Sequence, residues 1–513
     1  MARGDRRQNL ARMGEIAQVA ARHGFGHVFG RKDSPRATGD GERDRTRGRR
    51  VRAMLDELGP TFVKFGQILA TRPDIIPPDI IQELRGLQDD ARPEPFDRIR
   101  GVIEGELGLT LEQAYLDFDE EPIAAASIGQ VHRATLPGGQ VVVVKVQRPD
   151  AERQIEADIQ LMYQVARIAR QHVKRLQFID LVGTVDEFAR TVRRELDYGI
   201  EARNAEMFRN QFAGDDTVWI PRIHWRQTTP RVLTMERVEG SSLRHLDLDT
   251  WSAADRRQLA NRITETWMQM VFVHGFFHAD PHPANILVRG PDHLSLVDFG
   301  MTEQLTERDR EAAVRLLLDI LNGNARRMPR DLRALGVRYP RQIEEELSDQ
   351  LDVVLQRYAA TSIGEIDARS VLREIFQTIY RLDIKLPARW VVLDKALATL
   401  AGVALEVSPD FNVFEVARPY AMDMATRRFR PDRIAKRTAT DMGRYAGAVR
   451  EYPFQVSELL DELKDGSFEM TVRPEGLEEA VDKALAAGNR LALAMIAAAL
   501  IVASAVIAVF ARS

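Results

Sequence analysis

The stretch "VHGFFHADPHPANILV", residues 273–288, decides the fold together with "SLVDFG", residues 295–300. Asp280 and Asn285 lie five residues apart between apolar runs, and Asp298 follows thirteen residues later, where the pattern predicts the end of a strand. Carboxylate and amide oxygens suit Mg²⁺, which binds a few such ligands together with the phosphates of a substrate. The spacing therefore indicates a phosphoryl-transfer site, if the rest of the chain supplies its other parts.

The histidines of this loop allow a second interpretation, a metallohydrolase. His278, Asp280 and His282 resemble a cluster of metal ligands, and the prolines between them make an irregular loop in which such side chains can converge. For His274 and His282, capping or packing of the loop is the simpler explanation. The rest of the chain separates the interpretations, because a zinc hydrolase needs neither a buried strand lysine nor a distant glutamate, whereas phosphoryl transfer uses both.

A lysine interrupts the β-branched run "QVVVVKVQRP", residues 140–149. A buried ammonium needs a partner, because an unpaired charge in the interior costs several kcal/mol; the alternative is that Lys145 reaches solvent from an edge strand. The candidate partner lies in "RRELDYGIEARN", residues 193–204, where we expect Glu195 to pair with Lys145. The same predicted helix carries Asp197, Glu201 and Asn204.

A lysine on a strand, a glutamate on a helix, H-x-D-x4-N and D-F-G occur here in the order typical of protein kinases. Each motif is weak alone, but together they predict an α+β, bilobal, protein-kinase-like fold. One part departs from the pattern. In place of a glycine-rich loop the chain has "AAASIGQVHRA", residues 124–134, and alanine does not reach the positive φ angles that glycine reaches freely. We therefore expect this loop to hold nucleotide differently.

The chain resembles the UbiB/AarF (ADCK) family of atypical protein-kinase-like proteins. The resemblance spans residues 58–300 and separates this family from ordinary protein kinases. Its motifs are "LGPTFVKFGQILATRPDIIP" with a K-x-G-Q core, "AAASIGQVH", "VVVKVQRP", "RRELDYGIEARN", "HADPHPANIL" and "LVDFG".

The resemblance implies an ATP site with a divalent cation, Mg²⁺ or Mn²⁺. Lys145 would contact the α- and β-phosphates and pair with Glu195. Asp280 occupies the catalytic-loop position, where a base would accept a hydroxyl proton. Asn285 and Asp298 would hold the cation.

The resemblance also implies roles for residues beyond this phosphate and cation site. The main chain of Glu236 and Val238 would hold adenine. The helix with Lys64 and Gln67 would fold over the active site, fill the place where a protein substrate docks, and gate the site. The loop that would cover the phosphates contains Ala124, Ala125, Ala126 and Ser127.

Two functions follow from the resemblance. The first is a membrane-anchored ATPase that supports the biosynthesis of ubiquinone or a related isoprenoid quinone. Its expected partners are an isoprenoid quinone precursor or another membrane lipid, and proteins of quinone biosynthesis. The second is a true kinase that phosphorylates a small molecule, a lipid or a protein. The alanine-rich loop, together with Lys64 and Gln67, favours the ATPase, and the filled polar positions argue against an inactive scaffold.

Composition limits these expectations. With 513 residues the chain exceeds the usual size of one hydrophobic core, so more than one lobe is expected. A net charge of −4 does not favour nucleic acid as a partner. The chain has no cysteine, which excludes disulfides, thiolate metal sites and cysteine nucleophiles. The first residues contain no apolar segment of signal-peptide length.

An apolar segment, "LALAMIAAALIVASAVIAVF", covers residues 491–510. At about 1.5 Å per residue it reaches roughly 30 Å, the thickness of a bilayer core. We expect a transmembrane helix bracketed by Arg490 and Arg512, with a buried core helix as the alternative. Bacterial relatives often have two adjacent membrane helices, and this chain has room for one. The expected location is the inner (cytoplasmic) membrane of a bacterium, with the catalytic domain in the cytoplasm.

The sequence predicts six successive regions. In order, they are a basic N-terminal arm at 1–50, a helical K-x-G-Q extension at 51–115, a kinase-like N-lobe with inserted helices at 116–240, a helical kinase-like C-lobe at 241–450, a linker at 451–490, and the transmembrane helix at 491–510.

Overall fold

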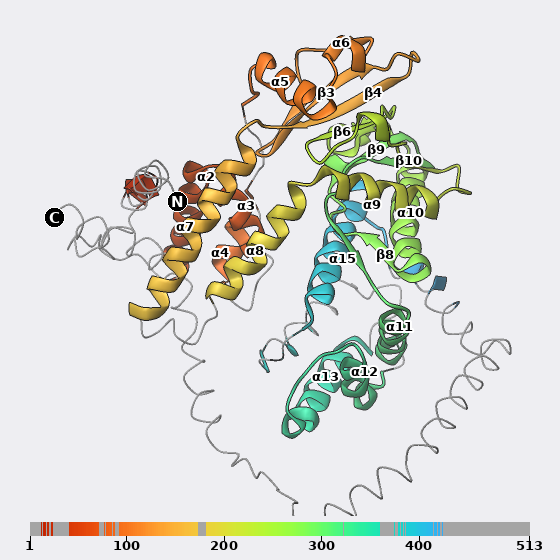
Figure 1. The fold of residues 1–513 in the computed structure, drawn as a ribbon. Helices are drawn as coiled ribbons and strands as arrows, with labels where there is room; N and C mark the ends of the chain where they lie inside the picture. The colour runs from red at the N-terminus through yellow and green to blue at the C-terminus, as the bar shows by residue number, and fades with distance from the viewer. Residues whose placement is uncertain are drawn as a thin grey trace, which may run out of the picture. The chain divides into compact units, whose positions relative to one another are not determined.

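The described residues of the computed structural model form two compact units (Figure 1). The first holds the described residues up to 251 together with 279–302, and the second holds 252–278 together with those from 303 onward. The continuous described stretches are 40–70, 92–172, 181–321, 323–359 and 386–413, with shorter pieces between 12 and 23, 76 and 87, 374 and 384, and 415 and 423.

An antiparallel sheet in the first unit carries Lys145. Its strands lie in the order β1-β3-β4-β6, and β2 pairs with β3. In β4, Val142, Val144 and Val146 are fully buried against α5 (Phe96–Leu107) and α6 (Leu111–Ala114). Because side chains alternate along a strand, Lys145 lies on the opposite face. The strands are β1 Asp117–Phe118, β2 Ala124–Ala125, β3 Gly129–Thr135, β4 Val141–Gln147 and β6 Val232–Glu236.

A second sheet in this unit brings two predicted metal ligands to one end of a hairpin. Strand β9 (Ile286–Gly290) pairs antiparallel with β10 (His293–Leu296), so Ile286 lies opposite Leu296. Asn285 precedes β9 and Asp298 follows β10, and the Val297 amide donates to the Asn285 carbonyl (3.2 Å). The outer strands of this sheet are β5 Val218–Trp219, beside β10, and β7 Ser241–Ser242, beside β9.

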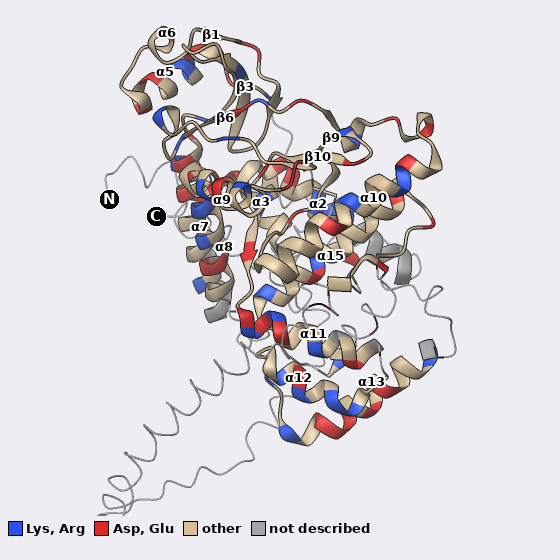
Figure 2. Cartoon of the chain, turned by 90° about the vertical axis from the view of Figure 1, so that its right-hand side faces the viewer, with Lys and Arg blue, Asp and Glu red and all other residues tan. Residues whose placement is uncertain are grey.

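Helices of the first unit build a separate apolar cluster around the K-x-G-Q motif. Helix α3 packs on α8, where the rings of Phe65 and Phe188 meet edge to face with centroids 5.1 Å apart. Figure 2 shows acidic and basic residues mixed along α7 and α8, and the ion pair between Arg193 and Glu156 joins these helices (2.7 Å). The helices are α2 Asp40–Leu58, α3 Pro60–Leu69, α4 Pro78–Leu84, α7 Ala151–His172, α8 Leu181–Glu195 and α9 Tyr198–Gln211.

Gly66, the glycine of K-x-G-Q, lies where α3 passes closest to its neighbours. A Cβ at this position would lie less than 3.0 Å from methyl carbons of Leu55 and Leu87, both buried. We expect Gly66→Ala to destabilise the protein by about 1–3 kcal/mol through overpacking. The control is Gly101→Ala in α5, which meets nothing within 4 Å and should stabilise by about 0.5–1 kcal/mol. Urea denaturation measures the free energy of unfolding of both variants. A change of the same sign in both would contradict the prediction.

The second unit is mainly helical. Helix α10 packs against α15, and α11 against α12. The short strands β8 and β11 pair with each other. Its elements are α10 Ala253–Met268, a π-helical turn at Gln269–His274, β8 Phe276–His278, β11 Thr302–Gln304, α11 Glu307–Leu321, α12 Met328–Ala334, α13 Glu344–Ala359 and α15 Ala388–Val407.

Across the described residues, no helix is long and apolar enough to cross a membrane. The predicted transmembrane segment, 491–510, and the predicted linker, 451–490, both lie outside these residues.

Candidate active site

Lys145 is the centre of the candidate site. Its Nζ donates to both carboxylate oxygens of Glu201 (2.9 and 2.8 Å) and lies 3.9 Å from Oδ2 of Asp298. The ammonium also sits over the ring of Tyr198, 5.1 Å from its centroid. The predicted partner, Glu195, is therefore wrong: Glu201 pairs with the lysine.

The correction has a local cause, because residues 193–204 do not form one helix. Helix α8 ends at Glu195, and α9 begins after Asp197, whose side chain caps it by accepting from the Gly199 amide (2.9 Å). The junction is held to the sheet by a hydrogen bond from the Gln147 side chain to the Leu196 carbonyl. The break separates the two glutamates, and only Glu201 faces Lys145.

Glu195 instead pairs with the lysine of the K-x-G-Q motif. Lys64 Nζ lies 2.8 Å from Glu195 Oε2, and both side chains are about four-fifths buried. Lys64 lies close enough to act electrostatically on Tyr198, the residue beneath the Lys145 ammonium. The Gln67 amide donates to the Leu87 carbonyl (3.3 Å). The motif thus joins the cluster through its lysine.

Burial and charge act in opposite directions on the central pair. Burial disfavours the Lys145 ammonium, but the carboxylates of Glu201 and Asp298 outweigh this effect and raise the pKa of the lysine. Burial also raises the pKa of Glu201, against the attraction of Lys145 and a hydrogen bond from the Phe299 amide. Lys145 is therefore a fixed positive charge at any physiological pH.

One face of α9 holds the D-F-G segment. Glu201 accepts from the Phe299 N–H, and the Asn204 amide donates to the Phe299 carbonyl (2.9 Å). The ring of Phe208 lies 5.7 Å from that of Phe299. The sequence motifs indicate no role for Glu201 or Asn204, and none of them includes Phe208. The signal was their spacing, since residues three and seven positions apart share a helix face.

The predicted cation ligands lie at one end of the β9–β10 hairpin, and Asp298 is near Lys145. Asp298 is about half exposed, and its Oδ1 accepts from the Gly300 amide (2.9 Å). The Asn285 amide nitrogen points to Asp280, at 3.2 Å from its carbonyl oxygen and 3.4 Å from its Oδ2. The amide oxygen of Asn285 is then the atom that could coordinate a cation. The oxygen donors fit Mg²⁺, which prefers such ligands and completes its shell with phosphates and water.

The histidines of the opening stretch have structural partners. His282 Nδ1 accepts from the Ala284 amide (3.2 Å), so this ring caps a short turn. His278 is buried, with its ring beside Trp267, whose indole donates to the His278 carbonyl (3.0 Å). In the described part of the chain, no three His, Asp or Glu side chains are grouped as metal ligands.

The alanine-rich segment forms a closed hairpin. Ala124 and Ala125 pair with Val131 and Gln130, and the Ala126 amide donates to the Gly129 carbonyl (2.8 Å). The predicted phosphate loop is thus a tight turn between β2 and β3. Ser127 within the turn is buried.

Comparison with known proteins identifies this architecture. Residues 86–332 match the ABC1 atypical kinase-like domain, and 351–412 match the UbiB helical domain. A Marinobacter nauticus protein, "Probable protein kinase UbiB", is 32% identical over 82% of this chain and 77% of its own length. The chain belongs to the UbiB family of atypical kinase-like proteins. The predicted family and kinase-like α+β fold are therefore confirmed.

Two further matches complete the comparison. "Uncharacterized protein sll1770" of Synechocystis is 32% identical over 84% of this UbiB-family chain and 74% of its own length. A solved structure, "The complex structure of Rv3197-erythromycin from Mycobacterium tuberculosis", covers 73% of this chain and 96% of its own, with 22% identity and a TM-score of 0.49.

The predicted adenine-binding segment of this UbiB-family chain follows the sheet. Glu236 is the last residue of β6, its amide donates to the Arg222 carbonyl (2.8 Å), and its carboxylate accepts from the Arg222 amide (3.1 Å). Val238 comes two residues later. A cavity of about 460 Å³ lies beside the residues that follow Val238. It is lined by Glu239, Gly240, Ser241, Val288 and Arg289.

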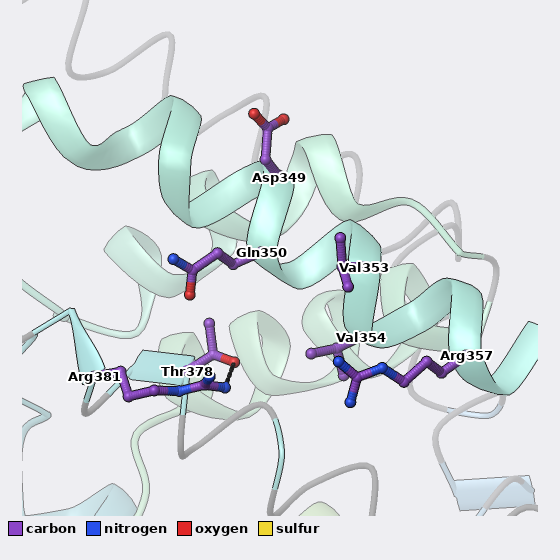
Figure 3. A pocket seen from close by; sticks show the side chains of 7 residues that line it. All are labelled: Asp349, Gln350, Val353, Val354, Arg357, Thr378 and Arg381. Carbon is purple, nitrogen blue, oxygen red and sulfur yellow. Dashed lines mark hydrogen bonds between the residues drawn. The ribbon is translucent and has the colours of Figure 1, made fainter.

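A different cavity lies in the second unit of this UbiB-family protein, partly within the matched helical domain (Figure 3). It has a volume of about 260 Å³. Among the residues that line it, Arg381 donates to Thr378 (3.2 Å), and Arg357 pairs with Glu374 (2.9 Å). None of the site residues described above lines it. Its lining consists of Asp349, Gln350, Val353, Val354, Arg357, Thr378 and Arg381.

Proposed function

We propose that this protein binds ATP with Mg²⁺ (or Mn²⁺), hydrolyses it, and supports the biosynthesis of ubiquinone or a related isoprenoid quinone at a membrane. The observation that carries the proposal is the contact of Lys145 with both Glu201 and Asp298. A positive charge locked between a helix glutamate and the D-F-G aspartate is the arrangement that kinase-like enzymes use to bind the phosphates of ATP. The quinone part rests on the family resemblance.

Each residue of the cluster has a task in this proposal. Lys145 binds the α- and β-phosphates, and Glu201 orients it. Asn285 and Asp298 hold the divalent cation, which neutralises phosphate charge when bound. Asp280 orients the attacking hydroxyl or water and accepts its proton, and its place is supported by the hydrogen bond from Asn285.

The K-x-G-Q helix favours hydrolysis over transfer to a bulky acceptor. Lys64 is tied to Glu195, and α3 is packed against α8 through Phe65, so this helix is a fixed part of the first unit. The alternative is a kinase that phosphorylates a small molecule, a lipid or a protein, which the name of the Marinobacter relative favours.

Product analysis with γ-labelled ATP separates the two functions. The purified protein is incubated with Mg²⁺ and labelled ATP, with and without membrane lipids. We expect free labelled phosphate and no labelled acceptor. Label on a lipid, a small molecule or the protein itself would establish the kinase, and unchanged ATP in every condition would contradict both.

The Lys64–Glu195 pair should control turnover. We expect Lys64→Ala to change the rate of ATP hydrolysis, or the preference between ATP and ADP, at least threefold, because one ion pair of about 1 kcal/mol corresponds to roughly a fivefold change in an equilibrium. Gln67→Ala should change the same quantity, with the same sign as Lys64→Ala. The control is Arg49→Ala, an exposed arginine of α2 that pairs with Glu83 of α4 (3.5 Å). Wild-type kinetics in both Lys64→Ala and Gln67→Ala would exclude the gating role.

The apolar segment 491–510 is proposed as the membrane anchor, with an isoprenoid quinone precursor or another lipid as the ligand on the membrane side. Removing residues 491–513 should move the protein from the membrane fraction to the supernatant, or leave only salt-sensitive attachment through the arginine-rich N-terminal region. Sedimentation after a high-salt wash measures this. A truncated protein that still sediments would show that the anchor lies elsewhere.

A further inference from the structure

Arg148 closes the alanine-rich turn from the neighbouring strand. It lies directly after β4, in the "VKVQRP" motif, and its side chain is mostly buried. Its backbone amide donates to the Ile128 carbonyl (2.8 Å), and its Nε donates to the Ala126 carbonyl (3.0 Å). With the bond from Ala126 to Gly129, these contacts hold both ends of the turn.

The other end of the same guanidinium reaches the segment that leads into α5. Arg148 Nη1 donates to Glu94 (3.1 Å) and Nη2 to the Arg92 carbonyl (2.6 Å). The Glu94 amide in turn donates to the Gln130 side chain (2.8 Å), which bonds to His132. The alanine-rich turn is therefore attached at two points to residues 92–94, ahead of the kinase-like sheet.

We propose that Arg148 is a positioning residue that keeps the alanine-rich turn in the shape that receives the nucleotide phosphates. The inference rests on the proposed ATP-binding function and adds a residue to it. Arg148 does not touch the nucleotide. Its side chain acts through the carbonyl group of Ala126, whereas the bond to Ile128 comes from its backbone amide and remains in every variant.

The physical reason is preorganisation. A glycine-rich loop is flexible and becomes ordered when it closes over phosphates, which costs conformational entropy. An alanine-rich turn that is already held in shape loses less conformational entropy when the nucleotide binds. We call the side-chain hydrogen bonds of Arg148 to the Ala126 carbonyl, the Arg92 carbonyl and Glu94 the clamp. If only about one tenth of the molecules keep the turn closed when the clamp is lost, the apparent Kd for the nucleotide rises about tenfold.

The clamp also requires an arginine in particular. Nε and Nη2 bind two carbonyl groups on different segments while Nη1 meets a carboxylate, a planar fork that a lysine ammonium on its flexible stem does not reproduce. Arg148→Lys should therefore keep the charge beside Glu94 but release the turn.

The test uses the full-length protein with four variants. Arg148→Gln and Arg148→Lys remove the fork, and Glu94→Gln removes the negative charge that pairs with both Arg148 and Arg98. Arg153→Gln is the matched control, because this exposed arginine lies five residues away and pairs with Asp150 at the surface. Hydrogen exchange of residues 124–130 is measured without nucleotide, Kd for Mg·ATP and Mg·ADP by calorimetry, and Tm by calorimetric scanning.

We expect Arg148→Gln and Arg148→Lys to accelerate exchange in the turn and raise the Kd for Mg·ATP about tenfold at a temperature well below Tm. Glu94→Gln should have a smaller effect of the same sign, and Arg153→Gln none. A lower Tm with unchanged exchange and unchanged Kd in the Arg148 and Glu94 variants would overturn the inference while leaving ATP binding intact. Absence of ATP binding in the wild-type protein would overturn the proposed function, and the inference with it.

Discussion

Replacing Lys145 with methionine is expected to abolish Mg·ATP binding and to lower the free energy of unfolding by about 3–5 kcal/mol. The loss of binding follows because the phosphates lose their fixed positive partner. The loss of stability follows because Glu201, which is almost fully buried, keeps its carboxylate without the ammonium that both of its oxygens contact. Calorimetry and urea denaturation measure the two effects.

A double-mutant cycle isolates this pair. Lys145→Met and Glu201→Gln together should cost less than the sum of the two separate changes, with a coupling of about 1–3 kcal/mol. Glutamine is chosen because its amide oxygen still accepts from Phe299. The same cycle with Glu195→Gln serves as the control and should be additive within about 0.5 kcal/mol, because Glu195 pairs with Lys64. Additivity for Lys145 with Glu201 would contradict the arrangement.

Asp298→Asn is expected to remove the Mg²⁺ dependence of nucleotide binding and to leave the protein folded. The amide keeps the shape of the side chain and its acceptor oxygen for the Gly300 amide, but it loses the negative charge that opposes the cation. Because Asp298 is about half exposed, its own contribution to stability is small. Titration of ATP with and without Mg²⁺ measures the effect.

The matched control for this change is Asp292→Asn. Asp292 lies in the turn between β9 and β10, at the end of the hairpin away from Asn285 and Asp298. It should bind Mg·ATP like the wild type. Equal Mg·ATP affinity in Asp298→Asn and the wild type would exclude Asp298 as a cation ligand.

The sequence by itself determined the elements that depend on local patterns. The β-branched run around Lys145 predicted a buried strand, and the order of the motifs predicted the kinase-like fold. The strand end at Asp298 was also predicted, and the hairpin of β9 and β10 in the structure brings it to the same end as Asn285.

Only the tertiary structure decided which residues meet across the chain. Glu195 and Glu201 differ little in sequence context, and the choice between them depends on the break at Leu196 and Asp197 and on the bonds that hold it to the sheet. The close approach around Gly66 and the reach of Arg148 to Ala126 likewise join segments far apart in the sequence. Such contacts leave no periodic signal, because packing and hydrogen bonding between distant segments select them only when the chain is folded.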